Sequence, residues 1–278
     1  MLKFVVLADI HLVPEGQLSH GLDTLDRLDQ AVAYVNDVHA AAAFVIFAGD
    51  LADHGEAAAY ERFKTAIAPL TPNVYLTLGN HDHRPTFLDV MGAHYANADT
   101  SCIDHVIDGG GHRVLVLDTS DPELRGAGRL EARQIDWLTA RLAEVPEPPV
   151  VIVLHHNIAP FGVQTDFIIL EDNGAFADAV LNHAHVRQVI SGHVHMTTSG
   201  NFRGVPFCTV AGAHYSIEPM STERSGPVPD ERGRYVSPVP RREGPGQHAV
   251  ELSSDDRVVV HMENFLARHL VLAPALYA

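Results

Sequence analysis

The sequence has little cysteine, no excess of positive charge and no long hydrophobic run. Its two cysteines, Cys102 and Cys208, lie far apart without a C-x-x-C pair, which disfavours a disulfide framework and a thiolate zinc site. No apolar run approaches the roughly 18 residues of a membrane span, and the run after Met1 is too short for a signal peptide. We therefore expect a cytoplasmic protein without a membrane partner. The net charge of -16 argues against a nucleic-acid polymer as partner, because such partners require positive patches.

The remaining composition fits a globular α/β protein. The 278 residues are 46% hydrophobic, enough for a large core in one domain or in a domain with an appendage. Short apolar runs predict buried strands at 4–8, 44–48, 74–78, 114–117, 150–154, 186–190 and 205–210. Apolar residues at helical spacing predict helices at 22–35, 60–67, 129–143 and 174–183. The order strand, helix, strand, helix, strand at the start of the chain predicts parallel neighbours.

The C-terminal part of the chain has a different character. Residues 221–247 are rich in proline, glycine and arginine and show little periodicity, which indicates a long mobile or interface loop. Residues 248–252 and 257–262 have the pattern of a hairpin, and an apolar tail ends the chain. We expect a main domain at 1–215 and a cap or subunit interface at 216–278. An apolar tail on an acidic protein favours a homodimer or a larger homo-oligomer.

Polar side chains follow the predicted strands at the points where the strands end. The stretch Gly79-Asn80-His81-Asp82-His83 follows one strand, and four other strand ends carry Asp or His in the same way. Open α/β sheets place their ligand sites at the carboxyl ends of the strands. The pairs Asp9-x-His11 and His193-x-His195 have the two-residue period of a strand, so we expect both members of each pair to point the same way. The candidate site residues are Asp9, His11, Asp50, Asn80, His81, His155, His193 and His195.

These residue types indicate a metal site. Imidazole together with carboxylate suits zinc, iron(II), manganese or cobalt better than calcium. One carboxylate, that of Asp50, can bridge two ions with its two oxygens. Two such ions about 3.5–4 Å apart can hold a hydroxide and clamp a phosphoryl group for in-line attack. The nineteen histidines of the chain agree with this interpretation.

The pattern resembles that of the calcineurin-like binuclear metallophosphoesterases. The resemblance extends from Met1 to about Gly212, and within the family the chain is most similar to bacterial class III cyclic-nucleotide phosphodiesterases and to glycerophosphodiesterases. It implies a four-layer α-β-β-α sandwich, a catalytic domain at 1–215 and two divalent metal ions. The motifs that carry it are Asp9-x-His11, Gly49-Asp50-x-x-Asp53, Gly79-Asn80-His81-Asp82, His155 and Gly192-His193-x-His195.

The resemblance also implies a role for each residue. One ion would be held by Asp9, His11, Asp50 and His195, and the other by Asp50, Asn80, His155 and His193. His81 would be catalytic, lying over the phosphate to stabilise charge or to protonate the leaving alkoxide. The Asp53 carboxylate would accept a hydrogen bond from the other ring nitrogen of His81 and fix its tautomer. The substrate would be bound by Asn80, His81 and His214, the last of which matches a histidine of the glycerophosphodiesterase branch.

We expect a metal-dependent phosphodiesterase that acts on small molecules by in-line attack of a metal-bridging hydroxide. A phosphomonoesterase usually recruits arginine for the extra charge of its substrate, and the motifs supply no assured arginine. Glycerophosphodiesters and cyclic nucleotides both remain open, since His214 favours the first while Asp53 and residues 128–138 favour the second. The alternatives are a broad phosphomonoesterase and a non-catalytic metal-binding scaffold. A scaffold should have lost ligands, and none is lost in this sequence.

Overall fold

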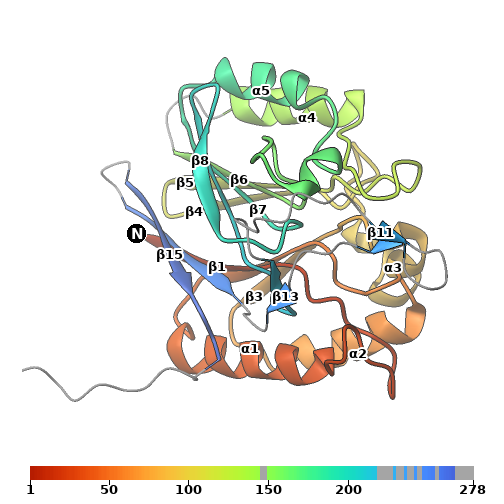
Figure 1. Cartoon of the computed structure of the whole chain (residues 1–278). Coiled ribbons are helices and arrows are strands. Elements are labelled where there is room, and N and C mark those ends of the chain that lie inside the picture. The colour runs from red at the N-terminus through yellow and green to blue at the C-terminus, as the bar shows by residue number, and fades with distance from the viewer. Residues whose placement is uncertain are drawn as a thin grey trace, which may run out of the picture.

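A computed structural model describes residues 1–144, 149–217, 228–229, 235–236, 241–242, 246–253 and 257–266. Two mixed β-sheets pack face to face, and helices cover the outer face of each (Figure 1). The α/β fold and the four-layer α-β-β-α arrangement expected from the sequence are confirmed. Within the described residues, no helix combines the length and the apolar character that crossing a membrane requires.

The first sheet has the strand order β15-β14-β1-β2-β3. Its three N-terminal strands are parallel, as the strand and helix order predicts, and β1 is buried between β2 and the antiparallel strand β14. This position explains the unbroken apolar run at the start of the chain, because a strand covered on both faces has no polar side. The strands are β1 (Leu2–Leu7), β2 (Phe44–Ala48), β3 (Asn73–Thr77), β14 (Gln247–Leu252) and β15 (Val258–Glu263).

The second sheet has the order β4-β5-β6-β7-β9-β8. Its central strands β5, β6, β7 and β9 are parallel, and an antiparallel strand lies at each edge. The predicted strands in this half of the chain are confirmed, but both edge strands were missed because they are short, partly exposed and weakly apolar. The strands are β4 (His105–Gly109), β5 (His112–Leu117), β6 (Val150–Leu154), β7 (Val186–Ser191), β8 (Thr198–Phe202) and β9 (Val205–Thr209).

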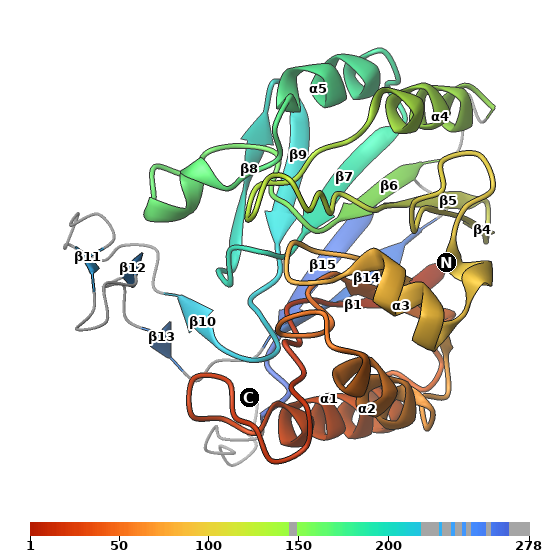
Figure 2. The same cartoon turned by 90° about the vertical axis from the view of Figure 1, so that its right-hand side faces the viewer.

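Helices cover the two outer faces, with α1 and α2 on the first sheet and α4 and α5 on the second (Figure 2). Asp23 caps α1 by accepting from the Leu25 amide at 3.0 Å, and Gln134 accepts from the Glu131 amide at the start of α4. The helices are α1 (Thr24–Val38), α2 (Ala57–Ile67), α3 (Arg84–Met91), α4 (Ala132–Ala143) and α5 (Asn173–Leu181), with short 3₁₀ turns η1 (Ala93–Tyr95) and η2 (Gln164–Phe167).

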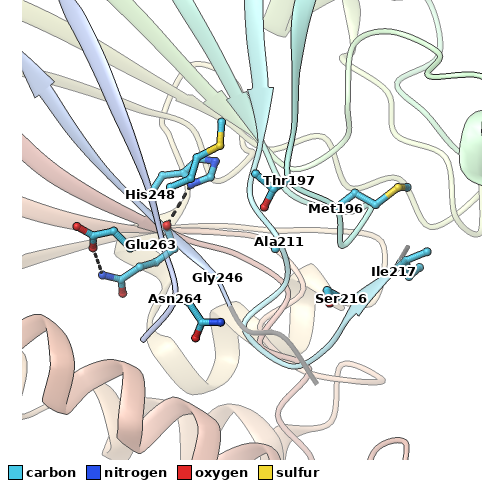
Figure 3. Close-up of a pocket in the computed structure, with 11 residues that line it drawn as sticks. Met196, Thr197, Ala211, Ser216, Ile217, Gly246, His248, Glu263 and Asn264 are labelled. Carbon is cyan, nitrogen blue, oxygen red and sulfur yellow. Dashed lines mark hydrogen bonds between the residues drawn. The ribbon is translucent and has the colours of Figure 1, made fainter. Parts of the chain in front are cut away.

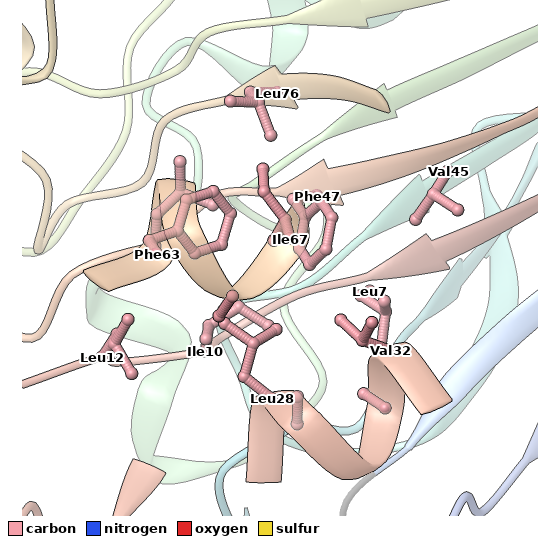
Figure 4. Packing of buried hydrophobic residues seen from close by; sticks show 14 of the residues in the cluster. Leu7, Ile10, Leu12, Leu28, Val32, Val45, Phe47, Phe63, Ile67 and Leu76 are labelled. Carbon is pink, nitrogen blue, oxygen red and sulfur yellow. The ribbon is translucent and has the colours of Figure 1, made fainter. Parts of the chain in front are cut away.

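Three apolar layers hold these elements together. Residues such as Leu28, Phe47 and Phe63 fill the space between the first sheet and its helices (Figure 4). A second layer, which includes Phe4 and Val116, lies between the two sheets, and a third lies under α4 and α5. Because the layer between the sheets is apolar, the polar side chains of a site are expected at the strand ends.

The C-terminal hairpin is confirmed, but it belongs to the first sheet. Strand β14 pairs with β1, so the expected boundary at residue 215 separates two parts of one sheet. Short strand pairs connect β10 (Ser216–Ile217) with β13 (Arg241–Arg242) and β11 (Val228–Pro229) with β12 (Tyr235–Val236). The hairpin turn, the apolar tail and the rest of the predicted 221–247 loop lie outside the described residues. Their proposed role as a cap or subunit interface stays a prediction.

Candidate metal centre

The predicted ligands come together where the carboxyl ends of both sheets meet. Asp9 and His11 follow β1, Asp50 follows β2, and Asn80 with His81 follows β3. The second sheet contributes the remaining three residues: His155 follows β6, and His193 and His195 follow β7. The ligand set predicted from the sequence is therefore brought together by two sheets, one supplying mostly oxygen donors and the other only imidazoles.

Five of these residues have a left-handed backbone. Left-handed φ costs on the order of 1–3 kcal/mol for a residue with a side chain, although Asp and His tolerate it better than most. The strands end at Leu7 and Ser191, so the spaced pairs lie beyond them, and the strand period we invoked for them is wrong. Their convergence depends instead on these turns, with φ of 56° at Asp9, 48° at His11, 52° at Asp50, 70° at His193 and 51° at His195.

The first ligand group contains Asp9, His11 and His195. Nε2 of His11 lies 3.1 Å from Nε2 of His195, which lies 3.5 Å from Oδ1 of Asp9. Nδ1 of His11 donates to the Asp53 carboxylate at 3.0 Å, and Nδ1 of His195 donates to the Tyr215 carbonyl at 2.9 Å. Both neutral rings therefore direct an Nε2 lone pair at the same point. A cation at that point relieves their repulsion.

The second group surrounds Nε2 of His155. This atom lies 3.3 Å from Oδ2 of Asp50, 3.3 Å from Oδ1 of Asn80 and 3.2 Å from Nδ1 of His193. The other ring nitrogen of His155 donates to the Ala48 carbonyl at 2.9 Å, so a neutral ring presents its Nε2 lone pair to the site. Four acceptor atoms thus point at one another, as they would around a metal ion.

Asp50 connects the two groups. Its Oδ2 lies 3.5 Å from Nε2 of His11 and 3.3 Å from Nε2 of His155. The ligand atoms of Asp9, Asp50 and His155 lie within 4.8 Å of one another, and so do those of Asp9, His11 and His195. This donor set fits two divalent cations that share one carboxylate, as the sequence predicts.

Burial and neighbouring charges shift the pKa values of the site in opposite directions. Burial raises the pKa of Asp9 to about 7 and, together with the nearby His155, lowers that of His193 to about 3. Burial would also lower the pKa of His155, but the Asp50 carboxylate outweighs it and raises the value to about 9. In the metal-free protein His155 therefore keeps a proton beside Asp50, and a divalent cation bound there would displace that proton and free Nε2 as a ligand.

His81 lies beside the ligands, but its orienting partner differs from the prediction. Nδ1 of His81 donates to the backbone carbonyl of Asp53 at 2.6 Å, while the Asp53 carboxylate is paired with His11. The expected contact between the Asp53 carboxylate and His81 is wrong. Burial alone would lower the pKa of His81, but Asp50 and the Asp53 carbonyl together raise it. The carbonyl leaves Nε2 of His81 available to hold a proton.

His214 has a position that the sequence did not indicate. The side chain is buried, and its Nε2 donates to the Ser19 carbonyl at 3.0 Å. Its Nδ1 is buried without a hydrogen-bond partner within the described chain, and burial lowers its pKa to about 3. The Nε2 of His214 is thus engaged by the Ser19 carbonyl, and the predicted substrate contact through His214 stays a prediction.

Several supporting groups were not predicted. The Tyr215 ring stacks on His195 with centroids 3.9 Å apart, and its carbonyl orients the same imidazole. The Ala48 carbonyl does the same for His155. Main-chain acceptors leave no mark on the sequence, so no pattern could have revealed them. Asp82 is a further structural acceptor, since its carboxylate accepts from three backbone amides and the Tyr60 hydroxyl.

A pocket of about 390 Å³ lies next to the segment that follows His195 (Figure 3). Met196 and Thr197 line one side of it, and His248, Glu263 and Asn264 line the other. The described residues around this pocket include none of the predicted metal ligands. The pocket is thus a neighbour of the metal-binding atoms and does not enclose them.

The fold and the buried His/Asp groups define a metal-dependent phosphoesterase. The family model of the calcineurin-like phosphoesterases, Metallophos, matches residues 2–197, and the chain belongs to this family. The family assignment made from the motifs is confirmed.

Curated relatives and solved structures agree with this assignment. A probable cyclic nucleotide phosphodiesterase of Rhodococcus erythropolis is 33% identical over 83% of this chain and 75% of its own length. Another from Rhodopseudomonas palustris is 30% identical over 95% and 93%, and a cAMP/cGMP dual specificity phosphodiesterase of Mycobacterium tuberculosis is 30% identical over 76% and 67%. A dimetal phosphatase from Danio rerio shares the fold with a TM-score of 0.67 at 16% identity, covering 95% of this chain and 96% of that one.

Proposed function

We propose that the protein is a phosphodiesterase that hydrolyses cyclic nucleotides with two divalent metal ions. The observation that carries the proposal is the convergence of seven ligands into two groups that share Asp50. Three of the curated relatives are named for cyclic-nucleotide hydrolysis, which supports this substrate class over other diesters.

The chain's own residues would divide the work between holding and proton transfer. Asp9, His11, Asp50 and His195 would hold one ion, and Asp50, Asn80, His155 and His193 the other. When bound, the ions would polarise the phosphoryl oxygens and make a water strongly nucleophilic. His81, fixed by the Asp53 carbonyl, would direct Nε2 at the phosphate and donate a proton to the leaving oxygen. The Asp53 carboxylate would hold the His11 ring in the tautomer that leaves Nε2 free for the metal.

The arrangement favours a monoanionic diester over a monoester. Arg84 directly follows the Gly79-Asn80-His81-Asp82-His83 stretch in the sequence. It donates to Asp118 at 2.8 Å and to Ser120, so its guanidinium is already engaged. Among the described residues of the motifs, a second phosphate charge would then have imidazoles and the metal ions as partners. The glycerophosphodiester alternative rests on His214, whose Nε2 is already engaged by the Ser19 carbonyl. A scaffold without activity is disfavoured because every ligand group is complete.

A substrate panel tests the proposal. Metal-free protein is reconstituted separately with Mn, Fe, Zn and Co and assayed on cAMP, cGMP, 2′,3′-cyclic nucleotides, glycerophosphodiesters and monoesters. We expect kcat/KM to be highest for a cyclic nucleotide and Asn80→Ala to remove most of the activity. A clear preference for glycerophosphodiesters or monoesters would overturn the substrate, and no hydrolysis of any ester by protein with two bound ions would overturn the enzyme.

A further inference from the structure

The second metal group is divided between the two sheets. Asp50 and Asn80 follow strands of the first sheet, while His155 and His193 follow strands of the second. The contact between Asn80 Oδ1 and His155 Nε2, at 3.3 Å, therefore crosses from one sheet to the other. A small change in how the turn after β3 sits against the second sheet would open this group while leaving each sheet intact.

Arg84 ties that turn to the second sheet. It is the first residue of α3 and lies four positions after Asn80. Its Nε donates to Oδ2 of Asp118 at 2.8 Å, and one terminal nitrogen donates to both the carbonyl and the hydroxyl of Ser120 at 3.0 Å. Asp118 directly follows β5, which runs beside β6 and so beside the strand that carries His155.

The partner carboxylate is held rigidly. Asp118 is fully buried, and its oxygens also accept from the amides of Ile103 and Ser120 and from the Ser120 hydroxyl. Its own backbone amide donates to Asp104 at 2.7 Å, and Asp104 is in turn bound by Gln134 of α4. Arg84 thus reaches a fixed point of the second sheet, and its guanidinium is the cationic group that neutralises the buried Asp118.

We propose that Arg84 is a positioning residue for the second metal ion, which it serves by fixing the Asn80-His81 turn against the second sheet through Asp118. The inference rests on the proposed metal centre. It assigns Arg84 no contact with substrate or metal. Two other ligands have direct links between the sheets, since Asp9 binds the His193 amide at 3.0 Å and His155 donates to the Ala48 carbonyl at 2.9 Å. The Asn80-His81 turn is connected to Asp118 of the second sheet through Arg84.

Arg113 offers a matched control. It lies on the same strand β5 at the opposite end, and it donates to Asp108 at 2.7 Å and to Glu144 at 3.0 Å. Arg113→Gln therefore removes charge-assisted hydrogen bonds to two exposed carboxylates beside the same strand, but away from the ligands. Its effect measures the loss of stability without any effect on the turn after β3.

The experiment titrates metal-free wild type, Arg84→Gln, Asp118→Asn, the double variant and Arg113→Gln with Mn²⁺ by calorimetry, with the thermal midpoint recorded for each. We expect one of the two binding events to lose about 10- to 100-fold in affinity in Arg84→Gln and Asp118→Asn, as for other residues that orient ligands, while the other event keeps its affinity. The double variant should lose no more than either single variant, because the two residues act as one unit. Arg113→Gln should lower the thermal midpoint and leave both affinities unchanged.

The outcomes separate the two proposals. If wild type binds fewer than two Mn²⁺ ions, the metal centre itself is wrong. If wild type binds two Mn²⁺ ions and Arg84→Gln binds both as tightly, the positioning role of Arg84 is wrong. Equal weakening of both ions in Arg84→Gln and Arg113→Gln would also overturn it, since that result indicates only general destabilisation. Arg84→Lys, which keeps the charge but loses the paired donors, should recover only part of the lost affinity.

Discussion

Gly79→Ala should disrupt the metal centre through a single added methyl group. A Cβ at this position would lie 2.2 Å from Oδ1 of Asp50 and 2.7 Å from Cδ2 of His155. The same Asp50 oxygen accepts from the His81 amide at 2.9 Å, so it is held in place on its other side. The methyl group therefore meets the carboxylate shared by both ions and one imidazole of the second group.

The size of the effect follows from these distances. An ordinary Cβ contact begins near 3.4 Å, so Asp50 or the turn after β3 must move by about 1 Å. Overpacking of this kind costs about 1–3 kcal/mol of stability. A displacement of about 1 Å in catalytic geometry costs on the order of 100-fold in rate. We therefore expect a folded protein with a modestly lower thermal midpoint and at least one weakened metal site.

The assay compares Mn²⁺ affinity, thermal midpoint and kcat on bis(p-nitrophenyl) phosphate for wild type, Gly79→Ala and Gly174→Ala. Gly174 lies in the first turn of α5 with no neighbouring atom within 4 Å of an added Cβ. Gly174→Ala, the control, should be more stable than wild type by about 0.5–1 kcal/mol, the usual difference between Ala and Gly in a helix, and should keep full activity. Wild-type metal affinity and turnover in Gly79→Ala would refute the close approach of Asp50 and His155 to the Gly79 backbone.

Three further predictions concern the metal affinity of Asp53→Asn, the pH dependence of stability and the removal of the ions. Asp53→Asn should weaken the ion bound by His11 by about 10- to 100-fold, because the carboxylate orients that imidazole; unchanged Mn²⁺ titrations would contradict this. Burial alone would raise the pKa of Asp53, but the hydrogen bond to His11 and the nearby imidazoles lower it to about 2. The Asp53 carboxylate therefore stabilises the metal-free protein above pH 3.8, the ordinary pKa of this group. This stabilisation is lost as the pH falls towards 2. In urea unfolding, the free energies of unfolding of wild type and Asp53→Asn should differ by a constant amount from pH 8 to 5, and this difference should shrink below pH 4. A difference that grows as the pH falls would contradict the predicted direction of the pKa shift. Chelation should lower the thermal midpoint by roughly 5–10 °C for each ion present at 100 times its Kd, because binding at that concentration stabilises the fold by about 2.7 kcal/mol. Calorimetry with and without EDTA measures the midpoint. An unchanged midpoint would exclude tightly bound ions.

The sequence was informative where structure depends on local patterns. Continuous apolar runs identify β1, β2 and β6 because strands buried on both faces must be apolar. Aspartate and asparagine are common in turns, but histidines such as His11 and His155 are not, and their recurrence at strand ends explains why the ligand set could be predicted before any geometry was known. Edge strands such as β8 lack this signal, since three of its five residues are exposed.

The sequence was less informative where the outcome depends on distant contacts. It could not show that the Asp53 carboxylate turns towards His11 while its carbonyl serves His81, because both acceptors belong to one residue. It could not show the left-handed turns at Asp9 and His11, which the surrounding packing imposes. His214 follows a glycine and an alanine beside the site, but only the fold reveals that Ser19 occupies its Nε2.

The place of β14 in the first sheet has a consequence for biosynthesis. Strand β1 is synthesised well before its neighbour β14, which lies far along the chain. Until β14 is made, a nascent chain carries an apolar strand with one open edge, which is a template for association with other chains. Synthesis of β14, more than any local folding step, protects the strand from which Asp9 and His11 extend.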